Sequence, residues 1–192
     1  MCEIAGFIDH NINYDSKDVA SLMGAAIYQR GPDSEGIWQD SNYGVNLIHR
    51  RLAILDLTSA GHQPMVSHCK RYVVIFNGEI YNFTQLKKEL DFACQSSISW
   101  RGHSDSEIIL QWFAHWGVEQ TLQKCKGMFA IVLWDREKQD LYLIRDRIGE
   151  KPLYYGYFNG AFGFASELKV LKVYPKFNAE INRDVLSADD VA

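Results

Sequence analysis

The sequence predicts an α+β domain whose strands are mainly antiparallel and joined by hairpins. Segments with helical and with strand periodicity do not alternate regularly, as they would in a protein built on a parallel sheet. The dipeptide Asn159-Gly160 separates two short apolar segments, and this pattern is a strong signal for a hairpin of adjacent antiparallel strands. The length of 192 residues suits one domain with a substantial core.

The first half of the chain is predicted to contain one clear helix and four strands. Apolar residues between positions 17 and 29 recur at helical spacing, with Asp15 or Ser16 available as N-cap and Gly31-Pro32 as the stop. Short β-type apolar runs predict the strands. These strands are expected at 4–9, 45–48, 52–55 and 72–77.

The second half is predicted to contain two helices followed by four strands. Apolar residues from Phe83 to Leu90 mark a short helix, and Ser104 with Glu107 forms a capping box that opens a longer one. Gly117 is expected to end that helix. The strands are expected at 128–134, 141–145, 153–158 and 161–165. We interpret residues 1–175 as the folded domain and 176–192 as a linker or tail.

Charge and hydropathy exclude several classes of function. The formal net charge is −4 and no run of five like charges occurs, so neither nucleic acid nor an anionic membrane is an expected partner. The start of the chain lacks a basic segment followed by an apolar run, and no apolar stretch of 18 residues is present. We therefore expect a cytoplasmic protein.

No metal site is expected from the cysteines and histidines. The four cysteines are far apart in sequence and form neither a C-x-x-C motif nor a zinc-type pairing with histidine. His49, His62 and His68 are thirteen and six residues apart, which does not fit a helical metal pair. Reduced thiols are the expected state of the cysteines.

Cys2 is the strongest candidate for a catalytic residue. Removal of Met1 would leave Cys2 at the N-terminus, with a free α-amine whose pKa is about 7.7–8.0. A base that titrates near neutral pH suits general-base catalysis, and an N-terminal amine is a known activator of a nucleophile on the same residue. A cysteine at position 2 is usually incidental, so the prediction depends on further motifs.

Several ordered motifs accompany Cys2. They are MCEIAGF (1–7), RGPD (30–33), HRRLAI (49–54), NGEIYN (77–82), SDSEIIL (104–110), GMFA (127–130) and DRIGEKPLYY (146–155). Together they resemble the class II glutamine amidotransferase domain of glutamine-hydrolysing asparagine synthetases, over residues 1 to about 172. The Pro32-Asp33 pair after Arg30-Gly31 resembles the asparagine synthetase branch of the family more closely than the amidotransferases of glucosamine-phosphate or purine synthesis.

The resemblance implies a fold and an activity. The fold would be a four-layer αββα sandwich of two antiparallel sheets between helices, the N-terminal nucleophile hydrolase fold. The activity would be hydrolysis of the side-chain amide of L-glutamine to glutamate and ammonia through a thioester on Cys2. The ammonia would supply an ATP-dependent amidation of the asparagine synthetase type.

The resemblance also assigns roles to site residues. Cys2 would be the nucleophile, and the side-chain amide of Asn77 with the N–H of Gly78 would form the oxyanion hole. The Asn77-Gly78 pair follows a predicted strand, where glycine lets backbone approach a substrate closely.

Charged residues would hold the two ends of glutamine. Arg51 would bind the α-carboxylate; successive strand residues face opposite ways, so the neighbouring Arg50 is expected on a solvated face. Asp105 would bind the α-ammonium, with Glu79 as a second acceptor. Arg30 and Asp33 are expected in a supporting loop.

The synthetic half of an asparagine synthetase has no counterpart in these 192 residues. The chain contains neither a Ser-Gly-Gly-Leu-Asp-Ser loop nor a G-x-x-x-x-G-K-[ST] loop. We expect no cofactor in this domain, and ATP with Mg only in a synthetase domain or subunit that receives the ammonia. The sequence leaves open the ammonia acceptor, the oligomeric state and whether this is an excised domain or a subunit.

Two other functions stay open at this point. A non-catalytic amidotransferase-like module would bind a ligand or a partner with the same site. An unrelated acyl-transfer enzyme would pair Cys2 with a histidine, although no sequence feature places a particular histidine beside Cys2.

Overall fold

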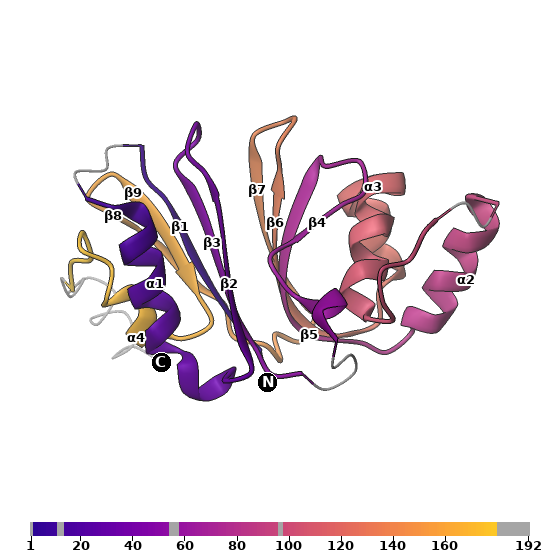
Figure 1. The fold of residues 1–192 in the computed structure, drawn as a ribbon, viewed down its shortest axis with the longest axis horizontal. Helices are drawn as coiled ribbons and strands as arrows, with labels where there is room; N and C mark the ends of the chain where they lie inside the picture. The colour runs from indigo at the N-terminus through magenta and orange to yellow at the C-terminus, as the bar shows by residue number, and fades with distance from the viewer. Residues whose placement is uncertain (1, 11–13, 54–57, 96–97, 180–192) are drawn as a thin grey trace, which may run out of the picture.

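Two antiparallel sheets stack face to face, and helices cover both outer faces (Figure 1). The computed structural model describes residues 2–10, 14–53, 58–95 and 98–179. The first sheet has the order β2-β3-β1-β9-β8 and the second the order β4-β5-β6-β7. The four-layer sandwich of two antiparallel sheets between helices is therefore confirmed.

The strands are short and mostly hairpin-connected. The first sheet contains β1 (Glu3–Ile8), β2 (Ser34–Asp40), β3 (Val45–Arg51), β8 (Tyr154–Phe158) and β9 (Ala161–Ala165). The second contains β4 (Met65–Val66), β5 (Tyr72–Ile80), β6 (Gly127–Asp135) and β7 (Asp140–Arg145). The predicted hairpin at Asn159-Gly160 joins β8 to β9, and both residues have positive φ, 48° and 84°.

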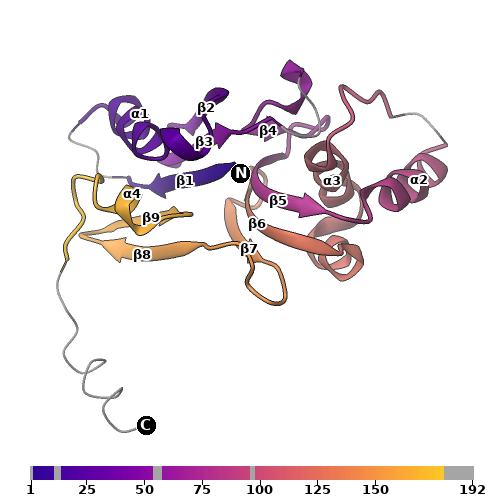
Figure 2. The ribbon, with the colours of Figure 1, turned by 90° about the horizontal axis from the view of Figure 1, so that it is seen from below.

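Each helical layer covers one sheet. The helices are α1 (Ser16–Ala26) and α4 (Leu168–Leu171) on the first sheet and α2 (Phe83–Ala93) and α3 (Asp105–Lys124) on the second (Figure 2). None of the helices in the described ranges is long and apolar enough to cross a membrane.

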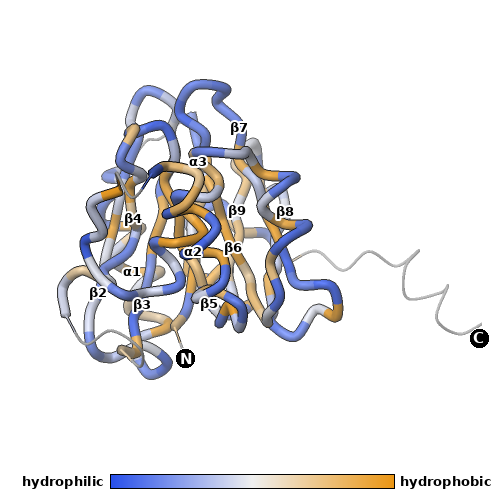
Figure 3. The backbone as a smooth tube through the Cα atoms, turned by 90° about the vertical axis from the view of Figure 1, so that its right-hand side faces the viewer, coloured by the Kyte–Doolittle hydropathy of each residue, from blue (hydrophilic) through white to orange (hydrophobic). Residues whose placement is uncertain are grey.

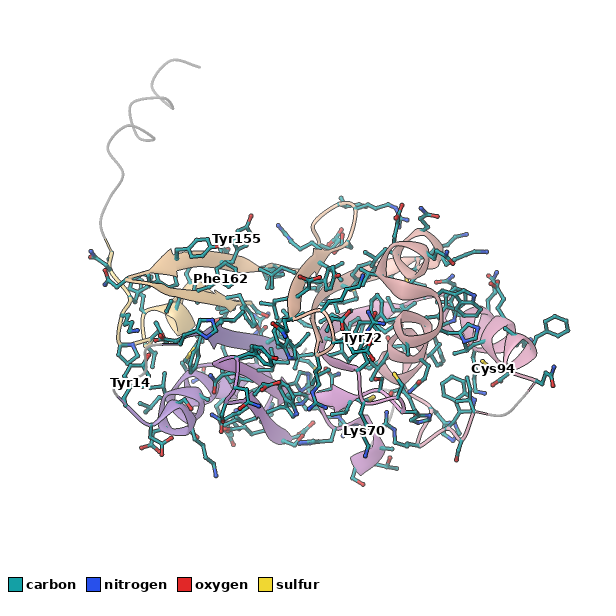
Figure 4. All side chains as sticks on the ribbon, turned by 90° about the horizontal axis from the view of Figure 1, so that it is seen from above. Tyr14, Lys70, Tyr72, Cys94, Tyr155 and Phe162 are labelled. Atoms are coloured by element: carbon teal, nitrogen blue, oxygen red, sulfur yellow. The ribbon has the colours of Figure 1, made fainter. Side chains whose placement is uncertain are left out.

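The core consists of three apolar layers, because successive residues of a strand point to opposite faces of its sheet, one toward the other sheet and the other toward the helices. Ile4 of β1 packs between the sheets with Leu47 and Ile75, whereas its neighbour Ala5 packs toward α1. A third cluster, which includes Leu110, fills the space between the second sheet and its helices. Figure 3 shows the apolar stretches along the strands and hydrophilic residues at many of the connections. Figure 4 shows side chains filling the space between the layers.

The helix boundaries follow the predicted signals closely. Asp15 caps α1 by accepting a hydrogen bond from the N–H of Lys17 at 2.8 Å. The helix ends at Ala26, three residues before the predicted end, and a 3₁₀ turn, η1 (Tyr28–Arg30), continues the chain. Gly117 has φ 80° and ψ 178°, so it breaks α3 as predicted, but a second helical stretch continues to Lys124.

Two β-strands and one α-helix were absent from the sequence-based prediction, and one predicted strand is wrong in part. β2 is an edge strand with only Gly36 fully buried, and β4 and α4 contain two and four residues, so all three lack a clear apolar period. Leu52 and Ala53 form no strand, because β3 ends at Arg51. The rest of the predicted strand at 52–55 lies outside the described residues.

The segment after α4 is held against the first sheet. The buried carboxylate of Asp9 accepts hydrogen bonds from the hydroxyl of Tyr174 at 2.6 Å and from the amine of Lys176 at 2.8 Å. The ring of Phe177 lies 5.1 Å from that of Phe158. Residues 176 and 177 of the predicted tail therefore pack on the domain.

Candidate active site between β1 and β5

The start of β1 lies next to β5 (Figures 1 and 2). A cavity of about 150 Å³ opens between residues of these two segments. Six residues singled out in the sequence line it, and they come from both sheets and from α3. They are Cys2, Arg51, Asn77, Gly78, Glu79 and Asp105. The structure thus brings together residues that are up to 103 positions apart, between Cys2 and Asp105.

Cys2 reaches the cavity because it directly precedes β1. Glu3 pairs with Arg50 in β3, and the residues next to this pair, Cys2 and Arg51, both line the cavity. The Cys2 Sγ donates a weak hydrogen bond to the carbonyl of Leu52 at 3.5 Å. Burial raises the pKa of the Cys2 thiol above its ordinary value. At neutral pH the thiol is therefore protonated, and a base is needed to activate it.

Arg51 and Arg50 leave β3 on opposite faces, as the strand period requires. The guanidinium of Arg51 lines the cavity and donates to the carbonyl of Thr58 at 2.7 Å. A Cβ atom at Gly61 would collide with this guanidinium, so glycine is required there for the arginine to lie as it does.

Arg50 is not the solvated residue that we expected. Its side chain is only 12% exposed and forms an ion pair with Glu35. Its Nε donates to the carbonyl of Gly24 in α1 at 3.0 Å. Arg50 therefore links β3 to α1 and to β2. The expectation of a solvated side chain was wrong because β2, which was not predicted, pairs with β3 and α1 packs against the same sheet.

The edge of β5 is open beside the cavity. β4 pairs only with Val73 and Val74, so the outward backbone groups beyond them need other partners. The N–H groups of Phe76 and Ile80 donate to the side chains of other segments. Alternate residues of a strand point their N–H groups to the same edge, so that of Gly78 points to this edge as well.

Gly78 lies where no other residue fits. A Cβ atom at this position would overlap the carbonyl oxygen of Met128 and the backbone of Phe129. The neighbouring Asn77 is buried, and its Oδ1 has no hydrogen-bond partner within the described residues. An unpaired buried oxygen can accept a hydrogen bond from a ligand, because leaving it without a partner is unfavourable.

The start of α3 supplies the cavity with a carboxylate. Ser104 caps the helix by accepting a hydrogen bond from the N–H of Glu107 at 3.3 Å, which is one half of the predicted capping box. The Glu107 carboxylate accepts instead from the N–H groups of Arg101 and Gly102, both at 3.0 Å. Asp105 is 4% exposed and accepts from the N–H of Ile80 at 2.9 Å and from that of Ser106 at 2.8 Å. Burial raises the pKa of Asp105, and these hydrogen bonds oppose the rise.

The charges in the cavity suit a free amino acid. Arg51 is cationic, whereas Asp105 and Glu79 are acidic, and all three line the same space with the Cys2 thiol. An α-carboxylate and an α-ammonium group carry the complementary pair of charges. The site can therefore hold a zwitterion beside a nucleophile.

Arg30 and Asp33 do not line this cavity. The Arg30 Nε donates to the buried Glu3 at 3.0 Å, and Asp33 accepts from the N–H of Ala53 at 2.8 Å. Both residues therefore contact segments that adjoin Cys2 and Arg51.

Sequence reasoning did not single out three polar residues of the cavity wall. These are Gln63, Ser106 and Lys151, which are 4%, 5% and 4% exposed. Ser106 and Lys151 stand inside quoted motifs, but Gln63 follows a region without a clear period. Their position within or near the motifs could have indicated that they belong to the site, whereas their residue types alone could not.

The structure argues against a histidine as the partner of Cys2. No histidine belongs to the cavity wall formed by the described residues. His49 is buried beneath it with Nε2 at 3.3 Å from the carbonyl oxygen of Phe76, and burial lowers its pKa to about 3. A ring that donates to a backbone carbonyl and resists protonation is a poor general base.

The sequence of the chain matches a known protein family. A family model described as a glutamine amidotransferase domain matches residues 1–189. The chain belongs to this family. Asparagine synthetase [glutamine-hydrolyzing] 1 of Bacillus subtilis is 36% identical over 97% of the chain, and Amidase chry2 of Gibberella zeae is 35% identical over 88%. The chain spans 29% and 26% of these two relatives.

A solved structure shares the fold of this amidotransferase domain. It is the glutamine phosphoribosylpyrophosphate amidotransferase of B. subtilis in complex with ADP and GMP. The TM-score is 0.73 at 20% identity, over 90% of this chain and 43% of that one. The four-layer sandwich is thus found in another protein of low sequence identity.

Proposed function

We propose that the domain hydrolyses the side-chain amide of L-glutamine to glutamate and ammonia, with Cys2 as nucleophile after removal of Met1. The observation that carries the proposal is the composition of the cavity wall. It combines a half-buried thiol, charged side chains of both signs and an open strand edge toward which the N–H of Gly78 points. No cofactor is needed for this reaction in the domain.

The reaction follows from these groups. The α-amine of Cys2 takes the thiol proton, and the sulfur forms a bond to the amide carbon of glutamine. The resulting oxyanion accepts hydrogen bonds from the Asn77 amide and the Gly78 N–H. The ammonium proton passes to the leaving nitrogen, ammonia departs, and water then cleaves the thioester to release glutamate.

The head group of glutamine would be held by the charged wall. Arg51 binds the α-carboxylate, and Asp105 with Glu79 binds the α-ammonium. This orientation would bring the amide toward Cys2, because the charged residues and the thiol line one small cavity.

We expect Arg51→Ala and Asp105→Ala to weaken glutamine binding, on the order of 2–5 kcal/mol, because each leaves a charge of the substrate unpaired. The effect should be a strong rise in KM in steady-state glutaminase assays. Arg50→Ala is the matched control: it should leave KM unchanged and lower the melting temperature, since Arg50 ties β3 to α1. A rise in KM for Arg50→Ala alone would contradict the assignment.

The ammonia would serve an ATP-dependent synthetase domain or subunit, with ATP and Mg bound there. This part of the proposal rests on the asparagine synthetase relatives. The 192 residues contain no phosphate-binding loop of either kind noted above.

The isolated chain is accordingly expected to act as a simple glutaminase. It should release glutamate and ammonia in equal amounts, because no acceptor is bound, and ATP with aspartate should not change the rate. Product analysis by chromatography tests this. Asparagine formation from glutamine, aspartate and ATP by the purified chain would contradict it. Glutamine binding without any release of ammonia by a chain that begins at Cys2 would favour the non-catalytic alternative.

A further inference from the structure

Gln63 joins the open edge of β5 to the start of α3. Its Oε1 accepts from the N–H of Phe76 at 2.6 Å, and its Nε2 donates to the Oγ of Ser106 at 3.2 Å. The Ser106 hydroxyl in turn donates to one oxygen of Asp105 at 3.4 Å. The other oxygen accepts from the N–H of Ile80 at 2.9 Å. This chain of hydrogen bonds therefore begins at Phe76 and ends at Ile80, two residues of the same strand β5.

Gly78 lies midway along the bridged stretch. Its N–H points to the same edge as the two N–H groups that the chain of hydrogen bonds holds. The side chains of Gln63, Ser106 and Asp105 are all buried, with residue exposures of 4%, 5% and 4%. Hydrogen bonds in such surroundings are stronger than in water and restrict the motion of the groups they join.

We infer that Gln63 is a positioning residue for the oxyanion hole. It fixes the Asn77-Gly78 edge relative to Asp105, and so relative to a glutamine molecule bound at its α-ammonium group. The inference rests on the proposed glutaminase function, and Gln63 acts through the backbone of β5, not through contact with the reacting atoms.

The chemistry of the position requires an amide. The N–H of Phe76 needs an acceptor, whereas Ser106, whose proton goes to Asp105, needs a donor. A carboxamide supplies both, a carboxylate supplies acceptors alone, and a thioether supplies only a weak acceptor. Gln63→Glu and Gln63→Met therefore remove one or both of these interactions at nearly constant side-chain length.

Gln63→Met should lower kcat about 10-fold and change KM by less than about 3-fold. Complete loss of an oxyanion-hole donor lowers kcat by roughly 10²–10³, and displacement of a donor that is still present should have a smaller effect. The matched control is Gln111→Met, at a glutamine of α3 that is 6% exposed and whose Nε2 has no partner within the described residues. It should leave kcat near the wild-type value.

Gln63→Glu should have the opposite effect on the two kinetic constants: a small change in kcat and a larger change in KM. The carboxylate still accepts from the N–H of Phe76, so kcat should lie closer to wild type than in Gln63→Met. The added negative charge raises the pKa of Asp105 further and favours its protonated form. KM should therefore rise. This partial rescue of kcat would not follow from a purely structural role of Gln63.

Several outcomes would overturn the inference. A rise in KM with unchanged kcat for Gln63→Met would show that Gln63 contacts glutamine itself. An equal loss of kcat in Gln111→Met would show that replacing any buried glutamine in this region lowers kcat, by a general loss of packing and stability. An unchanged kcat in Gln63→Met would show that the strand edge does not depend on this bridge.

Amide hydrogen exchange tests the bridge without any use of activity. The N–H of Phe76 should exchange faster in Gln63→Met than in wild type or Gln111→Met, and unchanged protection would overturn the inference. The two proposals can fail separately. A wild-type chain that begins at Cys2 and hydrolyses no glutamine refutes the proposed function, whereas exchange still decides whether Gln63 holds β5.

Discussion

A chain that keeps Met1, or carries an N-terminal tag, is expected to hydrolyse no glutamine, whereas the chain that begins at Cys2 turns it over. The reason is the protonation state of the nucleophile. Burial raises the pKa of the Cys2 thiol, and an acylated nitrogen has no basic lone pair to take its proton. No histidine in the cavity wall of the described residues can replace the amine. Glutaminase assays on the two forms, with their N-termini verified by mass spectrometry, measure the effect.

Substitutions at the nucleophile separate chemistry from binding. Cys2→Ala should abolish turnover and leave glutamine binding largely intact, and Cys2→Ser should retain at most a trace of activity. Cys69→Ala, at an exposed thiol outside the cavity, is the matched control and should remain active. A tagged chain as active as the processed one would exclude the N-terminal amine as the base.

Asn77→Ala is expected to lower kcat by roughly 10²–10³ with a smaller change in KM. Asn77 is buried in the cavity wall, and its Nδ2 is the atom that can donate a hydrogen bond to an oxyanion. In the proposed reaction this amide stabilises charge that exists only in the transition state. Steady-state kinetics over a range of glutamine concentrations separates the two constants.

The matched control for this substitution is Asn46→Ala. Asn46 is also 2% exposed, but it lies on β3 outside the cavity wall and donates to the carbonyl of Gly44. It should change stability more than kcat. An effect of Asn77→Ala confined to KM would instead assign Asn77 to the binding of the ground state.

The fold was predictable where periodicity or turn chemistry is local. The capped start of α1, the hairpin at Asn159-Gly160 and the break at Gly117 all depend on residues close together in sequence. The edge strands β2 and β4 were not predictable, because an edge strand with few buried residues leaves little apolar pattern.

The residues of the candidate site also fall into predictable and unpredictable ones. Cys2, Arg51 and Asn77 stand in recognisable motifs, and the structure brings all three to one cavity. Gln63 could not be assigned from sequence, because its importance depends on the length of β4. That strand stops before Phe76, so a side chain must satisfy the backbone there. The surroundings of Arg50 were likewise unpredictable without β2.

The central claim is that Cys2 carries the γ-glutamyl group during turnover. The most direct measurement is mass spectrometry, of the intact protein and then of its peptides, on the chain that begins at Cys2 after an acid quench while glutamine is in excess. The account predicts a fraction of protein heavier by one γ-glutamyl group, on the peptide that contains Cys2, and none in Cys2→Ala or in the form that keeps Met1. Rapid glutamine hydrolysis by Cys2→Ala, or an acyl group on any other residue, would contradict the account.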